Sequence, residues 1–295
     1  LSLRHNIECS MNTPKVIHWF RQDLRLSDNP ALFEAAKNSS ILPIYILDDI
    51  NSKELAMGEA SRFWLHHSLN SLNKSLDQNL SIYSGDPITV ILDIIDRLDI
   101  KEIFWNRCYE PWRINRDTHI KKELESKGIK VNTLNGSLLW EPWTIKKGDG
   151  TPYKVFTPYF RKGCLLSDEP RKPISTPINL DLFNDNNSLK DINALSLLPS
   201  TKWDIKMKSF WNIGELGANN RLTEFLNNGV ENYKEGRNIP SKPFVSRLSP
   251  HLHFGEISPN QAWHAAKKKG DDTNIDHFCS ELGWREFSYT QLYFN

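Results

Sequence analysis

The chain has 295 residues, which is long enough for two hydrophobic cores. Its 37 lysine and arginine residues nearly balance 36 aspartate and glutamate residues, so any nucleic-acid surface must be a local basic patch. Four scattered cysteines without a CxxC pair argue against zinc and a disulfide framework, and we expect no metal, reduced thiols and a cytoplasmic location. No apolar stretch approaches the ~20 residues needed to cross a bilayer, so no membrane partner is expected.

The first residues carry no pattern that predicts structure. Residues 1–14 lack the apolar centre of a signal peptide, and Met11 is the first methionine. We interpret 1–14 as an unpatterned N-terminal extension that arises from an upstream part of the reading frame.

From Val16 onward, short apolar runs alternate with longer helical periods. Buried strands are predicted at 16–20, 41–47, 81–84, 103–106 and 129–134, with helices at 31–37, 65–76, 88–98 and 115–127. Asn29 and Pro30 are suited to the N-cap and first position of the first helix. Strands separated by helices of this length imply right-handed crossovers. Residues 15–143 therefore predict an α/β doubly wound parallel-sheet domain.

The periodicity stops between 144 and 202, where six prolines and the polar run 184–188 predict a long linker and hence a domain boundary. From Trp203 the pattern is helical, which predicts an all-α unit over 203–295. The chain stops at Asn295 inside a helical pattern without a glycine or proline stop. We therefore expect a C-terminally truncated fragment of a longer protein.

The run Ser246-Arg247-Leu248-Ser249-Pro250 predicts an anion site at the start of a helix. Ser249 is suited to cap the helix amides, and Pro250 suits the next position because its missing N–H is not needed there. Hydroxyls and a guanidinium beside free helix amides attract phosphate. On the residues alone, an ordinary capped helix is the simpler interpretation.

A second motif, Glu281-x-x-Trp284-Arg285-Glu286-Phe287, places polar and aromatic side chains three and four residues apart, together with Ser288, on one helical face. An indole offers a base-stacking surface worth ~1–3 kcal/mol per base. Arg285 offers a phosphate fork, and Glu281 an acceptor for a base N–H. Without further context, Trp284 is interpreted as a core residue.

These motifs, with the opening segment 17–29, resemble the photolyase/cryptochrome family and most closely the bacterial cyclobutane pyrimidine dimer photolyases. The resemblance implies an antenna domain of α/β class followed by a partial all-α FAD-binding domain. It implies that FAD is bound by Tyr233, Val245, Ser246, Arg247, Leu248 and Ser249. It assigns catalysis to Glu281 and Trp284, and DNA binding to Arg237, Glu281, Trp284, Arg285 and Ser288. Val245 stands where the family often has threonine, and the turn 21–25 is expected to be architectural.

The function implied is light-driven repair of cyclobutane pyrimidine dimers by electron transfer from reduced FAD, with damaged DNA as partner and a monomeric protein. One alternative is a cryptochrome-type photoreceptor that binds FAD without repair. Another is that residues 1–295 alone are inactive and fail to retain flavin, because the contacts to the flavin ring are expected beyond Asn295.

An antenna chromophore is expected at 106–113, because this segment follows a parallel strand at its carboxyl end. Methenyltetrahydrofolate and a deazaflavin both stay open, since Trp112-Arg113 replaces the Asn-Glu pair of the folate-binding subgroup. Trp112 is suited to stack on a pterin, and packing against Pro111 explains it equally well.

Overall fold

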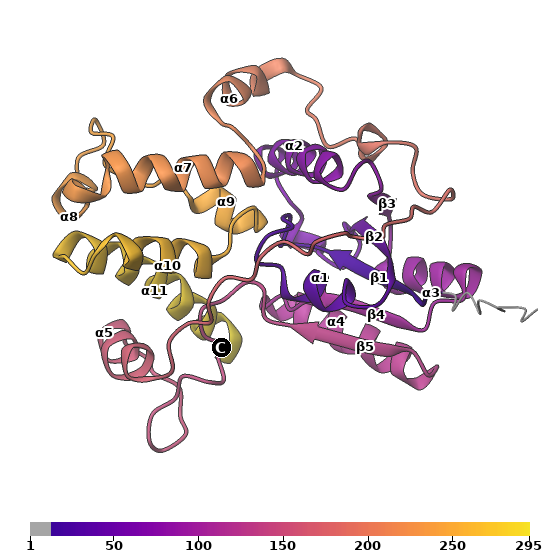
Figure 1. Ribbon diagram of the computed structural model, residues 1–295, viewed down its shortest axis with the longest axis horizontal. Coiled ribbons are helices and arrows are strands. Elements are labelled where there is room, and N and C mark those ends of the chain that lie inside the picture. The colour runs from indigo at the N-terminus through magenta and orange to yellow at the C-terminus, as the bar shows by residue number, and fades with distance from the viewer. Residues whose placement is uncertain (1–12) are drawn as a thin grey trace, which may run out of the picture.

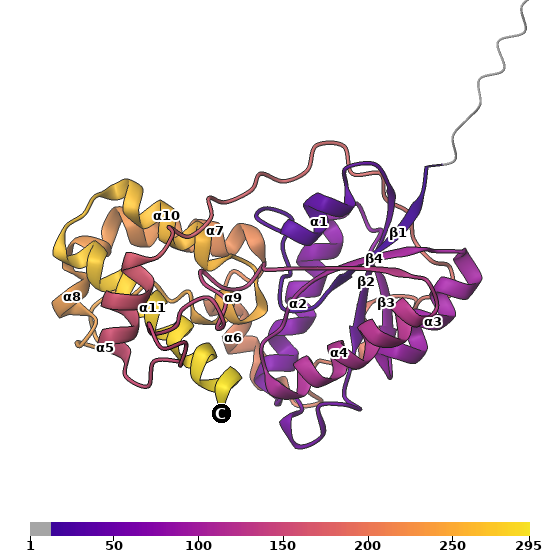
Figure 2. The same ribbon diagram turned by 90° about the horizontal axis from the view of Figure 1, so that it is seen from below.

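The structure is a computed structural model that describes residues 13–295. Most of the extension predicted over 1–14 lies outside the described residues. Figures 1 and 2 show a sheet flanked by helices beside a second, helical unit, with a long connector between them. Within 13–295, no helix is both long and apolar enough to cross a membrane.

The first unit is built on a five-stranded parallel sheet in the order β3-β2-β1-β4-β5. Its strands are β1 (Lys15–Phe20), β2 (Ser40–Leu47), β3 (Ser81–Ser84), β4 (Glu102–Asn106) and β5 (Lys130–Leu134). Its helices are α1 (Pro30–Ala35), α2 (Glu59–Ser75), α3 (Pro87–Leu98) and α4 (Pro111–Ser126), with a short 3-10 turn at Lys53–Leu55. The predicted fold class is confirmed. The largest errors are at two helix starts: α2 begins at Glu59, six residues before the predicted start. Helix α4 begins four residues early because Pro111 supplies the first helical position.

Both faces of the sheet are covered, and β1 shows why. Val16 and Phe20 point into a core shared with α1 and α2, whereas Ile17 and Trp19 point into a core shared with α3 and α4. The two helix pairs lie on opposite sides of the strands (Figure 2). A strand buried on both faces must be apolar at nearly every position, which is the pattern that the sequence shows. The Asn29 side chain caps α1 as predicted, accepting from the Leu32 amide at 3.1 Å.

The connector carries only short helical turns and packs on both units. The elements that follow β5 are α5 (Phe156–Pro158), a π-helical turn (Tyr159–Gly163), 3-10 turns (Cys164–Leu166, Ile192–Leu195, Lys202–Asp204) and α6 (Ile205–Phe210). Ile192, Leu195 and Leu197 join the core beneath α1 and α2. The connector is therefore held against the sheet unit before it reaches the helices.

The helical unit contains α7 (Glu215–Asn228), a 3-10 turn (Val230–Asn232), α8 (Tyr233–Gly236), α9 (Ser249–Phe254), α10 (Pro259–Lys269) and α11 (Thr273–Phe294). Leu139 and Trp140, which precede the predicted linker, pack into the core of these helices. The segment after β5 therefore belongs to both units.

The turn after β1 fastens the two units together. Arg25, which is buried, donates to the Gly255 carbonyl at 2.9 Å and to the Gly136 carbonyl at 2.6 Å. The Leu24 amide donates to the Phe254 carbonyl at 3.2 Å. Glu215, at the start of α7, accepts from the amides of the same turn at 2.8 and 2.9 Å. These contacts agree with the architectural role expected for residues 21–25.

Candidate functional site

A cavity of about 810 Å³ opens between α8, the start of α9 and α11, and we name it the helical-unit cavity. Nine of the eleven predicted site residues line it: Tyr233, Arg237, Val245, Ser246, Arg247, Leu248, Ser249, Glu281 and Arg285. Its volume is within the range of cofactor sites. Segments more than 30 residues apart in sequence therefore meet around one space.

The wall that precedes α9 is suited to an anion. Arg247 has a left-handed backbone (φ 53°), and such strained residues cluster at ligand sites. Its guanidinium lies 5.3 Å from the Phe210 ring and forms no ion pair with a carboxylate among residues 13–295. The hydroxyls of Ser246 and Ser249 lie on the same wall. An unpaired guanidinium with two neighbouring hydroxyls fits the phosphate groups of a dinucleotide.

The prediction that Ser249 caps this helix is wrong. Ser249 is the first residue of α9, and the cap position is Leu248, which has helical dihedral angles (φ −84°, ψ −9°) and no side-chain cap. The left-handed turn at Arg247 instead brings the Ser246 hydroxyl to the Leu248 amide at 3.4 Å. The Ser249 hydroxyl, without a hydrogen bond in the described part of the chain, is left for the cavity.

A carboxylate occupies the opposite wall. Glu281 forms an ion pair with Arg237, and this hydrogen bond raises the pKa of Arg237. The Tyr233 ring lies 5.5 Å from the same guanidinium, and burial raises the pKa of Tyr233 to about 12. At neutral pH this end of the cavity therefore carries a paired carboxylate and an uncharged phenol.

Trp284 and Ser288 do not line the cavity. The Trp284 ring stacks on Phe156 of the connector, with centroids 3.7 Å apart and planes inclined by 13°, and the residue is 45% exposed. The Ser288 hydroxyl donates to the Trp284 carbonyl at 2.9 Å inside α11. Helical spacing placed these residues beside Glu281, but it could not show that the connector supplies a stacking partner. Trp284 is therefore neither a core residue nor part of the cavity wall.

Arg285 is already engaged by protein groups. It donates to the Ser137 carbonyl at 2.8 Å and pairs with Glu286 at 3.2 Å. Glu286 is buried and accepts from the amides of Leu139 and Trp140 at 2.8 and 3.2 Å. Burial raises the pKa of Glu286 to about 7. The sequence analysis assigned no role to Glu286. Its position among apolar residues of one helix could have predicted a buried carboxylate.

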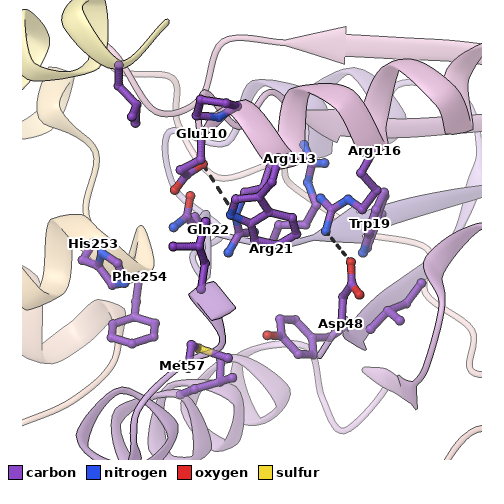
Figure 3. A pocket seen from close by; sticks show the side chains of 17 residues that line it. Trp19, Arg21, Gln22, Asp48, Met57, Glu110, Arg113, Arg116, His253 and Phe254 are labelled. Carbon is purple, nitrogen blue, oxygen red and sulfur yellow. Dashed lines mark hydrogen bonds and ion pairs between the residues drawn. The ribbon is translucent and has the colours of Figure 1, made fainter. Parts of the chain in front are cut away.

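A second cavity, of about 360 Å³, lies at the carboxyl ends of β1 and β2 and the start of α4 (Figure 3); we name it the sheet-edge cavity. Arg116 pairs with Asp48 at 3.0 Å, and Arg113 with Glu110 at 3.5 Å. Trp112 lines the cavity, its ring 4.6 Å from the Arg113 guanidinium and 5.1 Å from that of Arg116. The predicted antenna segment is thus only partly at a cavity wall.

Asn106, the first residue of that predicted segment, is buried away from the sheet-edge cavity. Its amide donates to Asp23 at 2.6 Å and to Asn29 at 2.7 Å. It therefore holds the turn after β1 in place. Among residues 13–295, no three potential metal-ligand side chains gather at one point.

Known proteins resemble this chain over almost all of its length. Deoxyribodipyrimidine photo-lyase of Agrobacterium fabrum is 37% identical over 292 residues, which make up 96% of this chain and 60% of that protein. Cryptochrome-1 of Arabidopsis thaliana is 28% identical over 92% of this chain and 42% of that protein. A bacterial class III photolyase structure from Agrobacterium tumefaciens superposes with a TM-score of 0.91 at 37% identity, over 98% of this chain and 61% of that chain.

The chain thus spans about 60% of the length of the photolyases it matches. A family model for DNA photolyase matches residues 16–177, which include the whole sheet and the first part of the connector. Because that match covers more than half of the sequence and the fold agrees, the chain belongs to the DNA photolyase family.

Proposed function

We propose that the protein repairs cyclobutane pyrimidine dimers in DNA by light-driven electron transfer from reduced FAD. One observation carries the proposal: a single cavity gathers the unpaired Arg247 and two serine hydroxyls on one wall and the Glu281–Arg237 pair on the other. The relative from Agrobacterium fabrum is named for this activity. The arrangement is suited to hold a phosphate-bearing cofactor beside a carboxylate.

In this proposal Ser246, Arg247 and Ser249 hold the phosphates of FAD, and Tyr233 forms part of the wall. Bound FAD would supply light absorption and the transferred electron. Leu248 is almost fully buried, so it supports the wall by packing and not by a polar contact. Val245 has no hydroxyl, so the phosphate contacts fall to the two serines.

Glu281 is placed to recognise a base. Its carboxylate is held by the ion pair with Arg237, and a carboxylate accepts N–H groups strongly. A lesion that enters the cavity must leave the duplex, which costs a few kcal/mol and least for a base pair that is already damaged. Glu281 then exchanges part of its bond to Arg237 for a bond to the flipped base.

Trp284 and Arg285 were both expected to contact DNA from one face of the helix, but we propose different roles for them. Trp284 is exposed outside the cavity, where it offers a stacking surface to DNA. Arg285 is bound to Ser137 and Glu286, so it positions α11 instead of providing a free phosphate contact. Ser288 is turned into its own helix and is left without a DNA contact.

The sheet-edge cavity is the proposed antenna site. Trp112 supplies an aromatic surface, and the guanidinium groups of Arg113 and Arg116, each paired with a carboxylate that lines the same cavity, lie near its ring. A planar chromophore such as a folate or a deazaflavin suits the aromatic surface.

A cryptochrome-type photoreceptor is the second candidate, because Cryptochrome-1 of Arabidopsis thaliana matches 92% of the chain. Both candidates use the helical-unit cavity for FAD, and only repair requires a lesion beside Glu281. A protein that binds FAD and responds to light without restoring thymines would support this alternative.

The test measures light-dependent repair of an oligonucleotide with one thymine dimer by the protein from its full reading frame. Glu281→Ala should lower the repair rate about 10-fold or more, because a lost hydrogen bond to a charged group costs ~1.5–3 kcal/mol. Glu224→Ala is the matched control, since Glu224 pairs with Arg221 on the surface of α7. Equal repair by Glu281→Ala and the control would remove Glu281 from the mechanism.

A further inference from the structure

A single side chain lines both cavities. Among residues 13–295, His253 in the last turn of α9 is the only residue that the helical-unit cavity and the sheet-edge cavity share. Together with Phe254 it closes the sheet-edge cavity on the side away from Asp48 and Arg116 (Figure 3). Ser249, at the other end of this short helix, lines the helical-unit cavity. Ligands in the two cavities therefore have the His253 imidazole as a common wall.

The His253 ring is available to a ligand. The residue is exposed, and its ring nitrogens form no hydrogen bond or ion pair with any residue between 13 and 295. By contrast, His251 is buried, and its Nδ1 lies 2.5 Å from a carboxylate oxygen of Glu256. Helix α9 therefore turns one histidine into the protein and presents the other to the cavities.

The surroundings of His253 favour the neutral ring. Desolvation by the protein lowers the pKa of His253; the charge of Glu110 opposes this shift, and the charges of Arg113 and Arg285 add to it. Glu110 and Arg113 line the sheet-edge cavity, whereas Arg285 lines the helical-unit cavity. A neutral imidazole has one N–H donor and one acceptor nitrogen. The ring can therefore donate to a ligand in one cavity and accept from a ligand in the other.

We propose that His253 bridges the ligands of the two cavities, so that each ligand strengthens the binding of the other. A ligand in the sheet-edge cavity fixes the orientation of the ring and determines which nitrogen carries the proton. The second ligand then meets an oriented ring and loses less conformational entropy on binding. The inference rests on the proposed function, with FAD in the helical-unit cavity and a folate or a deazaflavin in the sheet-edge cavity.

Equilibrium dialysis of the apoprotein from the full reading frame measures this coupling without any repair assay. The dissociation constant of FAD is determined alone and with saturating methenyltetrahydrofolate or a deazaflavin. It should fall about 10-fold when the sheet-edge ligand is present, and FAD should strengthen binding of that ligand by the same factor, as linkage requires. A wild-type protein in which neither ligand changes the affinity of the other would overturn the proposal. Failure of both sheet-edge probes to bind would also overturn it.

Substitutions test whether His253 carries the coupling. His253→Leu removes both ring nitrogens, so the affinity of FAD should no longer depend on the sheet-edge ligand. His253→Gln keeps a donor and an acceptor and should retain part of the dependence. His119→Leu is the matched control, because His119 is exposed on α4 and lines neither cavity. Full coupling in His253→Leu would refute the bridge, and so would loss of coupling in His119→Leu.

The same measurements separate this inference from the proposed function. If FAD and a sheet-edge ligand both bind the wild-type apoprotein but do so independently, the proposed function stands and the His253 bridge is refuted. If FAD does not bind, the proposed function is refuted and the bridge with it.

Discussion

Gly255 offers a direct test of how the two units fit together. It ends α9 with a left-handed backbone (φ 69°), and its carbonyl accepts from Arg25. A Cβ added at this position would lie 2.0 Å from the Gln22 carbonyl oxygen and 2.6 Å from the Asp23 Cα. Both are backbone atoms of the turn after β1, so the contact is relieved only if the two units separate locally.

The expected cost of Gly255→Ala has two parts. A left-handed backbone costs a residue with a Cβ about 1–2 kcal/mol, and forced overlap in a packed region adds about 1–3 kcal/mol. Gly128→Ala is the control, because Gly128 has φ 77° but nothing within 4 Å of its added Cβ. The control should lose only the first part, so the two variants should differ by about 1–3 kcal/mol in free energy of unfolding.

Urea unfolding followed by tryptophan fluorescence measures both variants at one pH and temperature. The slope of the free energy against urea should be the same in each, so that midpoints compare stability alone. If Gly255→Ala and Gly128→Ala lose equal stability, α9 is not seated against the turn after β1, and the interface described for the two units is wrong.

Three further outcomes are expected. Burial raises the pKa of Glu286 from 4.5 to about 7, so the folded state holds this proton more tightly than the unfolded state, and stability falls as pH rises through that window. The free energy of unfolding, measured in urea between pH 5 and 8, should therefore depend less on pH in Glu286→Gln, by up to about 3 kcal/mol. Parallel plots of this free energy against pH for the wild type and the variant would contradict the prediction. Arg247→Ala should weaken FAD binding by the protein from its full reading frame about 10-fold in fluorescence titrations, whereas Arg221→Ala should not. Trp284→Ala should lower affinity for single-stranded DNA by about 1–3 kcal/mol in anisotropy measurements, and unchanged affinity would exclude stacking.

The sheet could be predicted from the sequence because a strand that is buried on both faces is a continuous apolar run. Each strand is a short apolar run bounded by polar residues, and the predicted strand bounds fall within one residue of those observed. The start of α4 was missed because the helical period is weak there, with few buried positions in its first turns. Local pattern thus gave the elements and their order.

The site was predictable only where its residues are neighbours in sequence. Ser246 to Ser249 form one wall, and Glu281 and Arg285 lie one helical turn apart on another. The stack of Trp284 on Phe156 joins residues 128 positions apart, and no local pattern contains it. The course of the connector, which determines that contact, follows from packing of the whole chain.

The segment 136–143 shows why the two units act together. From the sheet unit, Arg25 donates to the Gly136 carbonyl. From α11, Arg285 donates to the Ser137 carbonyl, and Glu286 accepts from the next two amides, those of Leu139 and Trp140. Arg25 also fixes the end of α9 through Gly255. The walls of the helical-unit cavity are therefore positioned by groups that the sheet unit supplies. A change in this segment should therefore alter the helical-unit cavity, although none of its residues lines that cavity.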